Sequence, residues 1–194
     1  IKTMTSAVVV GSITKEFRSG NEGNPYYFDE KGLHSINSLG LPNPGIQYWE
    51  ENLPAAVKMC HAAGKPLIMS VAGFNAGEFA LLAGKAFASG ADIVELNLGC
   101  PNVLISGAQK GIISFDQDLV TEILQEVSSE VGPDANVLVK FSPISDPFLL
   151  RKLFGICNRF SVVKGVVNIN TYPNGFAFNG DKPAITPNNG LGGI

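Results

Sequence analysis

A cysteine, a lysine and several asparagines in this sequence stand where apolar segments give way to turns. The clearest case is the segment 93–102, in which an apolar run ends at Gly99, Cys100 and Pro101. A thiol can accept or release a proton, and neighbouring carboxamides can both donate and accept hydrogen bonds. This combination predicts proton transfer at a neutral heterocycle that alternates N–H and C=O groups.

Other polar residues occupy equivalent positions after apolar runs. The full set is Ser12, Asn97, Cys100, Asn102, Lys140, Asn170 and Thr171, with Asn37 joining from a loop. Lys140 ends the apolar run 137–139, so its ammonium group should be partly buried and should need an anionic partner. Because no acidic residue lies close to it in sequence, an anionic cofactor or intermediate is the expected partner.

Each of these residues also has an ordinary structural explanation. A single asparagine after a strand is often a turn residue, a single cysteine is often a small core residue, and a lysine stem can reach solvent from a buried position. The functional interpretation therefore depends on their gathering at one edge. Cys60 and Cys157 fall within helical segments, and we interpret both as packing residues.

Alternating strands and helices would bring the polar residues together. Apolar runs predict strands at 7–10, 66–71, 93–98, 137–141 and 165–169. Apolar spacing and capping residues, among them Asn75 and Asp146, predict helices at 48–63, 76–89, 115–131 and 147–158. This alternation is typical of βαβ units, in which parallel strands end at one edge of the sheet.

Both a (β/α)8 TIM barrel and an open parallel sheet satisfy this pattern, and as a barrel this chain would hold only about five of the eight strand–helix units. No GxGxxG motif follows the first strand, which argues against a dinucleotide-binding open sheet. Residues 14–45 are rich in Gly, Asn and Pro, and we expect them to form a loop insertion over the active site. Residues 171–194 are expected to be loop-like.

Composition limits the possible partners and location. The 194 residues are 45% hydrophobic and 16% charged, as expected of one globular domain. A net charge of −3 argues against nucleic acid as a partner, and no apolar run is long enough for a membrane segment. The three cysteines are widely spaced without a CxxC pair, which argues against a metal site and favours the reducing cytoplasm.

Four motifs, in this order, resemble the dihydroorotate dehydrogenase family. They are Asn-Ser-Leu-Gly-Leu-Pro-Asn at 37–43, Glu-Leu-Asn-Leu-Gly-Cys-Pro-Asn at 95–102, Val-Lys at 139–140 and Asn-Thr at 170–171. The resemblance runs nearly end to end, with support from 20–21, 69–73 and 189–194. It implies a flavin-bearing (β/α)8 barrel that oxidises dihydroorotate to orotate in de novo pyrimidine biosynthesis.

The resemblance also implies a role for each site residue. Cys100 would be the general base that removes a proton from C5 of dihydroorotate, while hydride leaves C6 for N5 of FMN. The implied substrate-binding residues are Asn37, Leu39, Gly40, Leu41, Asn97, Asn102, Asn170 and Thr171. The implied FMN-binding residues are Gly11, Ser12, Asn97, Lys140 and Asn170. Lys140 would stabilise the negative charge of the reduced flavin, and a nearby cation or polar loop is expected to lower the pKa of the Cys100 thiol.

Details of the motifs point to a branch of the family. A cysteine base and the Gly-Leu-Pro-Asn sequence at 40–43 resemble the soluble homodimeric branch that passes electrons to fumarate. By contrast, Gly11-Ser12 and Asn170-Thr171 look more like the quinone-linked branch, and soluble members usually have Ser where this chain has Gly99. We expect fumarate as acceptor, a homodimer, and a single FMN-binding barrel domain over 1–194 that is incomplete at both ends. Such a segment alone should bind FMN poorly.

Two other interpretations remain open. A tRNA dihydrouridine synthase is also a flavin barrel, with an Asn-x-Gly-Cys-Pro motif similar to residues 97–101, but it should bind RNA and has no counterpart of the motif at 37–43. A non-catalytic barrel relic would only bind a pyrimidine or a partner. The relic should carry an ordinary thiol at Cys100 rather than one with a lowered pKa.

Overall fold

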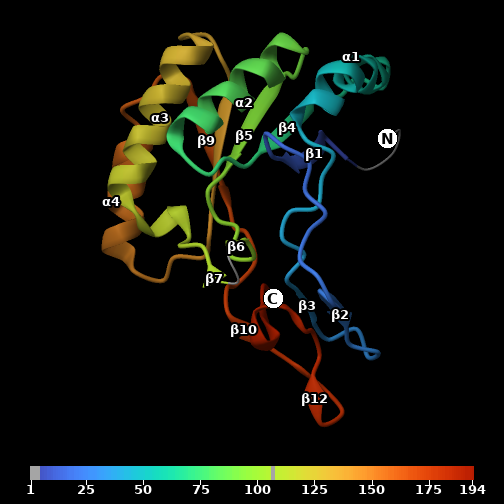
Figure 1. Cartoon of the computed structure of the whole chain (residues 1–194). Coiled ribbons are helices and arrows are strands. Elements are labelled where there is room, and N and C mark those ends of the chain that lie inside the picture. Colours follow the sequence, from blue (N-terminus) through green and yellow to red (C-terminus); the bar gives the residue numbers. More distant parts are fainter. Residues whose placement is uncertain (1–4, 106–107) are drawn as a thin grey trace.

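Five parallel strands form the main sheet in this computed structural model, which describes residues 5–105 and 108–194 (Figure 1). In order across the sheet, the strands are β1 (Val8–Ile13), β4 (Leu67–Val71), β5 (Ile93–Asn97), β8 (Val137–Phe141) and β9 (Val163–Asn168). The register sets Ser70 beside Glu95 and Asn97 beside Lys140. Because all five strands run the same way, the residues that close them meet at one edge.

Helices cover one face of this sheet. They are α1 (Ile46–Ala62), α2 (Ala76–Ala88), α3 (Gln117–Val131) and α4 (Pro147–Cys157). The main core joins their buried residues to alternate strand residues such as Met69, Leu96 and Val139. Since neighbouring strand residues face opposite sides, Ser70 and Glu95 lie on the other face.

Side-chain caps fix where the helices begin. Asn75 Oδ1 accepts a hydrogen bond from Glu78 N at 2.9 Å, and Asp146 Oδ1 accepts one from Phe148 N at 2.9 Å. Both predicted caps are therefore confirmed. The third helix begins later than expected, because Asp116 caps α3 and the preceding residues form a 3-10 helix.

Short antiparallel pairs gather beyond one end of the main sheet, where Figure 1 shows β2, β3, β10 and β12 close together. The pairs are β2 (Tyr26–Phe28) with β3 (Ser35–Asn37), β6 (Leu104–Ile105) with β7 (Ala108–Gln109), β10 (Gly175–Phe176) with β13 (Leu191–Gly192), and β11 (Phe178–Asn179) with β12 (Lys182–Pro183). Two 3-10 helices, Ile113–Phe115 and Pro187–Gly190, complete the elements. A second, small core consists of Ile36, Ala177, Ala184 and Ile185.

The structure corrects two further expectations about the strands and loops. The first strand was expected to end before Gly11, but β1 continues to Ile13 and contains Gly11 and Ser12. Gly11 has a φ of 108°, and a Cβ there would meet the carbonyl oxygen of Ser70, so this position requires glycine. The segment 171–194 was expected to be loop-like, but it contains paired strands and a 3-10 helix.

The five expected strands and four expected helices are otherwise present, and the fold is the part of a (β/α)8 barrel that five consecutive strands form. None of the helices in the described ranges combines the length and the apolar character that crossing a membrane would require.

Candidate active site

Four neighbouring strands contribute to one group of hydrogen-bonded polar side chains on the sheet face away from the helices. Ser12 Oγ on β1 lies 2.8 Å from Ser70 Oγ on β4, and Ser70 Oγ donates to Glu95 Oε1 on β5 at 2.7 Å. Lys140 Nζ on β8 donates to the same Glu95 oxygen at 2.6 Å. Glu95 is only 4% exposed, so its charge is stabilised within the protein by these two donors.

The anionic partner of Lys140 is therefore Glu95, a residue of the chain itself. A cofactor or intermediate was expected because no acid lies near Lys140 in sequence, but the two residues are 45 positions apart and meet across paired strands. Glu95 was missed as a site residue because it interrupts an apolar run in the middle of a predicted strand. A charged residue inside such a run is the signal that could have identified it.

Two carboxamides extend this group toward the loop that follows β9. Asn97 Nδ2 donates to Ser12 Oγ at 2.8 Å, and Asn170 Nδ2 donates to Asn97 Oδ1 at 3.0 Å. Asn170 Oδ1 in turn accepts from the backbone N–H of Thr171 at 2.9 Å. The strand ends thus hold both asparagines in defined orientations.

The 14–45 segment also contributes polar side chains to this site, through hydrogen bonds to Asn102. Asn102 Nδ2 donates to Asn37 Oδ1 at 3.1 Å, and Asn21 Nδ2 donates to the Asn102 carbonyl oxygen at 3.0 Å. The backbone of Asn37 pairs with Gly193 through hydrogen bonds of 3.0 and 2.7 Å. Within the segment, the Asn43 side chain makes four hydrogen bonds to groups between Thr14 and Gly45, and these stabilise its conformation.

Residues from these segments enclose a cavity of about 280 Å³. Its lining consists of Gly11, Ser12, Asn37, Leu39, Gly40, Leu41, Pro42, Asn97, Cys100, Pro101, Asn102, Asn170 and Thr171. The cavity thus brings together every residue expected to bind substrate, as well as Cys100. Lys140 is not among its described lining residues, because its ammonium group is turned toward Glu95. Thr171 Oγ1 is buried without a hydrogen-bond partner in the described chain, and so is available to a ligand.

Burial raises the pKa of the Cys100 thiol above its ordinary value of 9.0. A hydrogen bond from the backbone of Asn102 and the charges of Lys140, Arg18 and Lys110 act in the opposite direction but do not outweigh the burial. The expectation of a lowered pKa is therefore wrong, because the thiol lies deeper than the sequence indicates. Three cations nonetheless favour its thiolate form.

Two of these cations were not identified from the sequence. The Arg18 guanidinium carbon lies 5.2 Å from the centroid of the Phe74 ring, and Lys110 Nζ lies 4.9 Å from the same centroid. Phe74, Lys110 and Cys100 also line a small hollow of about 20 Å³ next to the main cavity. Burial lowers the pKa of Lys110, although Glu78 and Cys100 act to raise it. Both cations follow no apolar run, so their sequence positions carried no signal.

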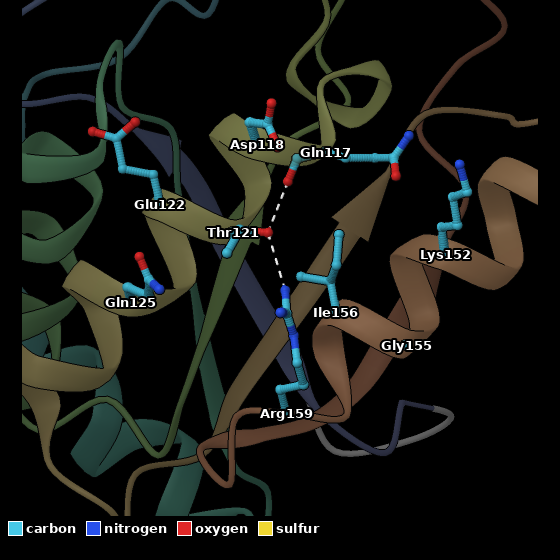
Figure 2. A pocket seen from close by; sticks show the side chains of 9 residues that line it. All are labelled: Gln117, Asp118, Thr121, Glu122, Gln125, Lys152, Gly155, Ile156 and Arg159. Carbon is cyan, nitrogen blue, oxygen red and sulfur yellow. Dashed lines mark hydrogen bonds between the residues drawn. The ribbon is translucent and has the colours of Figure 1, made fainter.

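A larger hollow of about 590 Å³ lies elsewhere, between α3 and α4. Figure 2 shows its side chains, with the Thr121 hydroxyl between Gln117 and Arg159. Thr121 Oγ1 donates to the Gln117 carbonyl oxygen at 2.8 Å and accepts from Arg159 at 3.2 Å. Its polar groups of both signs lie on helix surfaces and include none of the expected site residues, so the strand-end cavity is the candidate site.

A parallel β/α sheet with a partly buried thiol, carboxamides and an ion pair at its carboxyl edge defines a protein of the β/α-barrel class with a polar ligand site. The chain belongs to the dihydroorotate dehydrogenase family, whose family model matches residues 1–194. This membership argues against the tRNA dihydrouridine synthase interpretation.

Relatives within the family differ in their named electron acceptor. The catalytic subunit of dihydroorotate dehydrogenase B (NAD(+)) from Thermoplasma acidophilum is 38% identical over 148 residues, which cover 76% of this chain and 46% of that protein. The putative dihydroorotate dehydrogenase A (fumarate) from Streptococcus pyogenes serotype M1 is 31% identical over 195 residues, which cover 100% of this chain and 59% of that protein. The chain thus spans about half the length of the curated relatives that it matches.

Solved structures agree with the fold. Ligand-free DHODH from Eimeria tenella superimposes with a TM-score of 0.73 at 17% identity, covering 96% of this chain and 56% of that chain. The complex of the Eimeria tenella protein with ferulenol gives a TM-score of 0.71 at 17% identity, covering 85% of this chain and 50% of that chain.

Proposed function

We propose that the protein oxidises dihydroorotate to orotate with FMN, in de novo pyrimidine biosynthesis. The observation that carries this proposal is the convergence of Cys100 and five polar side chains on one cavity of about 280 Å³. These side chains belong to Asn37, Asn97, Asn102, Asn170 and Thr171. Membership of the family and the names of its relatives support the same reaction.

The polar side chains suit the substrate. Dihydroorotate carries ring N–H and C=O groups and a carboxylate, and carboxamides can both donate to and accept from such groups. The Thr171 hydroxyl, buried without a partner in the described ranges, adds one more donor or acceptor. Leu39, Gly40 and Leu41, which line the cavity from the 14–45 segment, would contribute backbone groups.

Cys100 would act as the general base at C5. Only its thiolate form can accept the proton, and burial makes this form scarce at neutral pH. The positive charges of Lys140, Arg18 and Lys110 oppose that effect and would stabilise the thiolate when substrate is in place. The reaction should therefore accelerate with rising pH until the thiol is fully ionised.

The donor groups at the strand ends also fit FMN. Lys140 supplies an ammonium group, and Asn97 and Asn170 supply carboxamide N–H groups, which match the oxygen and nitrogen acceptors along the pyrimidine edge of a flavin. Ser12 Oγ accepts a hydrogen bond from Asn97 and so holds that carboxamide in place. We propose that Gly11, Ser12, Asn97, Lys140 and Asn170 hold the cofactor. When bound, FMN supplies the acceptor for the hydride that leaves C6.

The proposal also covers the electron acceptor, the oligomeric state and the cellular location of the protein. We propose fumarate as the acceptor, since a relative that aligns with the whole chain is named as fumarate-linked. We propose a homodimer, supported by the resemblance to the homodimeric branch and by exposed aromatic side chains such as Phe28 and Phe178. The three free cysteines suit the reducing cytoplasm.

Anaerobic flavin reduction tests the proposal. Dihydroorotate is added to the FMN-loaded, full-length protein, and the loss of flavin absorbance is followed for wild type, Cys100→Ala and the control Cys60→Ala. Cys60 is equally a cysteine but is buried in α1, away from the cavity. We expect rapid bleaching that slows by roughly a hundredfold in Cys100→Ala, the scale of losing a general base, and not in the control.

Two results would contradict the proposal. Flavin that stays oxidised with dihydroorotate, although FMN is bound, would support the relic that binds without catalysis. Equal rates in wild type and Cys100→Ala would remove Cys100 as the base. Reoxidation of the reduced protein by fumarate, compared with NAD+, tests the acceptor in the same cuvette.

A further inference from the structure

The side-chain hydrogen bonds at the strand ends form one series with a single direction from donor to acceptor. The acceptor at the end of this series, Glu95 on β5, sets that direction. Lys140 can only donate and the Glu95 carboxylate can only accept. Ser70 has a single hydroxyl proton, which it gives to Glu95 at 2.7 Å. The 2.8 Å contact between the two serines therefore has Ser12 as its donor.

The same direction continues through the carboxamides. Because the Ser12 proton is committed to Ser70, Ser12 Oγ accepts from Asn97 Nδ2. The backbone N–H of Gly99 donates to Asn97 Oδ1 at 3.3 Å, and that of Thr171 donates to Asn170 Oδ1 at 2.9 Å. Backbone N–H groups can only donate, so these two bonds agree with the carboxamide orientation that the series from Glu95 imposes.

We propose that Glu95 is a positioning residue that sets the orientation of the carboxamides of Asn97 and Asn170, through Ser70, and the position of Lys140, through their ion pair. The proposal rests on the proposed function, since it concerns the same dihydroorotate and FMN site. With this orientation, one Nδ2 hydrogen of each asparagine is used within the series, and the second has no partner among the described residues and can donate to a ligand. The site therefore selects ligands that present carbonyl or carboxylate oxygens to these two residues.

Burial and register make Glu95 suited to this role. Glu95 is 4% exposed and Ser70 is 1% exposed, and the sheet register sets the two side by side. Hydrogen bonds to a charged acceptor are roughly twice as strong as those between neutral groups. A buried carboxylate therefore holds the direction of the whole series more firmly than a neutral residue could, and rigid strands rather than loops position it.

Three variants separate this role from a merely structural one. Glu95→Gln removes the charge at constant shape, and Ser70→Ala interrupts the series but leaves the ion pair in place. Ser142→Ala is the matched control, because Ser142 is also buried but its Oγ has no hydrogen-bond partner within the described residues. The side-chain amide signals of Asn97 and Asn170 are measured by NMR without ligand, and orotate affinity and the FMN midpoint potential are measured on the loaded, full-length protein.

We expect the amide signals of both asparagines to move in Glu95→Gln and Ser70→Ala and to stay in place in Ser142→Ala. Orotate should bind about fivefold more weakly after Ser70→Ala, the effect of one net hydrogen bond, and about tenfold more weakly after Glu95→Gln. Only Glu95→Gln should make the FMN potential more positive, because Lys140 then lacks its counter-charge and favours the anionic reduced flavin. A tenfold preference for the reduced form corresponds to about 30 mV for a two-electron couple.

The outcomes are distinguishable from failure of the proposed function. Unmoved amide signals in both Glu95→Gln and Ser70→Ala, or orotate affinity equal to wild type in both, would overturn the proposal. If wild type itself binds no orotate but the amide signals move in these two variants alone, the proposed function fails and the positioning role of Glu95 is supported.

Discussion

Gly99, between β5 and the candidate base, provides a sharp test of the packing described above. A Cβ at this position would meet the backbone nitrogen of Ser142 and would lie 2.7 Å from the carbonyl carbon of Phe141. Backbone atoms cannot move aside as a flexible side chain can. The Gly99→Ala variant must therefore push the end of β8 away from β5, straining the hydrogen bond from Ser142 N to Ser114 Oγ at 3.0 Å.

The size of the effect follows from two opposing contributions. Overpacking by one methyl group typically costs about 1–3 kcal/mol, whereas replacing glycine by alanine stabilises by about 0.4–1 kcal/mol through the unfolded chain. We expect a net destabilisation of roughly 1–2 kcal/mol. For a chain of 194 residues this corresponds to a fall in Tm of about 2–8 °C.

Thermal and urea unfolding measure the effect, with Gly155→Ala as the matched control. Gly155 lies inside α4 and a Cβ there meets nothing within 4 Å, so the same chemical change should stabilise by about 0.5–1 kcal/mol. The two variants thus differ in sign. A Gly99→Ala protein that unfolds at or above the wild-type temperature would refute the reasoning.

Three further outcomes follow from the site and its surroundings. The rate of flavin reduction should rise with pH from neutrality to beyond pH 9.0, since burial raises the pKa of Cys100. Lys110→Met should move this pH profile to still higher pH, because a cation that favours the thiolate is lost. Stopped-flow rates measured against pH check both outcomes. Asn43→Ala should destabilise the 14–45 segment by about 2–4 kcal/mol through the loss of four hydrogen bonds, seen as faster limited proteolysis. Burial would raise the pKa of Asp92, but hydrogen bonds from the Leu67 backbone and His61 outweigh this effect and lower the pKa below 3.8. The contribution of Asp92 to stability is therefore complete above pH 3.8 and is lost as the pH falls through the lower pKa of the folded state. Asp92→Asn should lose less stability than wild type on acidification, as measured by urea unfolding at several pH values.

Much of the fold could be predicted because its elements are locally encoded. The strands β4, β5 and β8 are short, mainly apolar runs bounded by turn residues, and Asn75 and Asp146 cap their helices as their positions indicate. The small strands after Thr171 could not be predicted, because pairs of two residues are too short to show an alternating pattern.

The candidate site was predictable where its residues follow strands. Cys100, Asn97 and Thr171 each end an apolar run, so parallel topology alone places them at one edge. Glu95 and Lys110 could not be found in this way, because one lies within a strand and the other depends on a contact with Phe74 made in three dimensions. The depth of the cysteine, and hence the direction of its pKa shift, likewise depends on how distant segments cover it.

The pairing of Asn37 with Gly193 has a consequence for how the molecule is made. Each strand of the main sheet pairs with the next one along the chain, so the sheet can grow by local steps as the chain is synthesised. The bridge to Gly193, by contrast, closes a loop of 156 residues, and contacts of such high sequence separation form late. The scaffold should therefore fold first and the cavity close last, so that a nascent chain has no competent ligand site until residues near 193 have emerged from the ribosome.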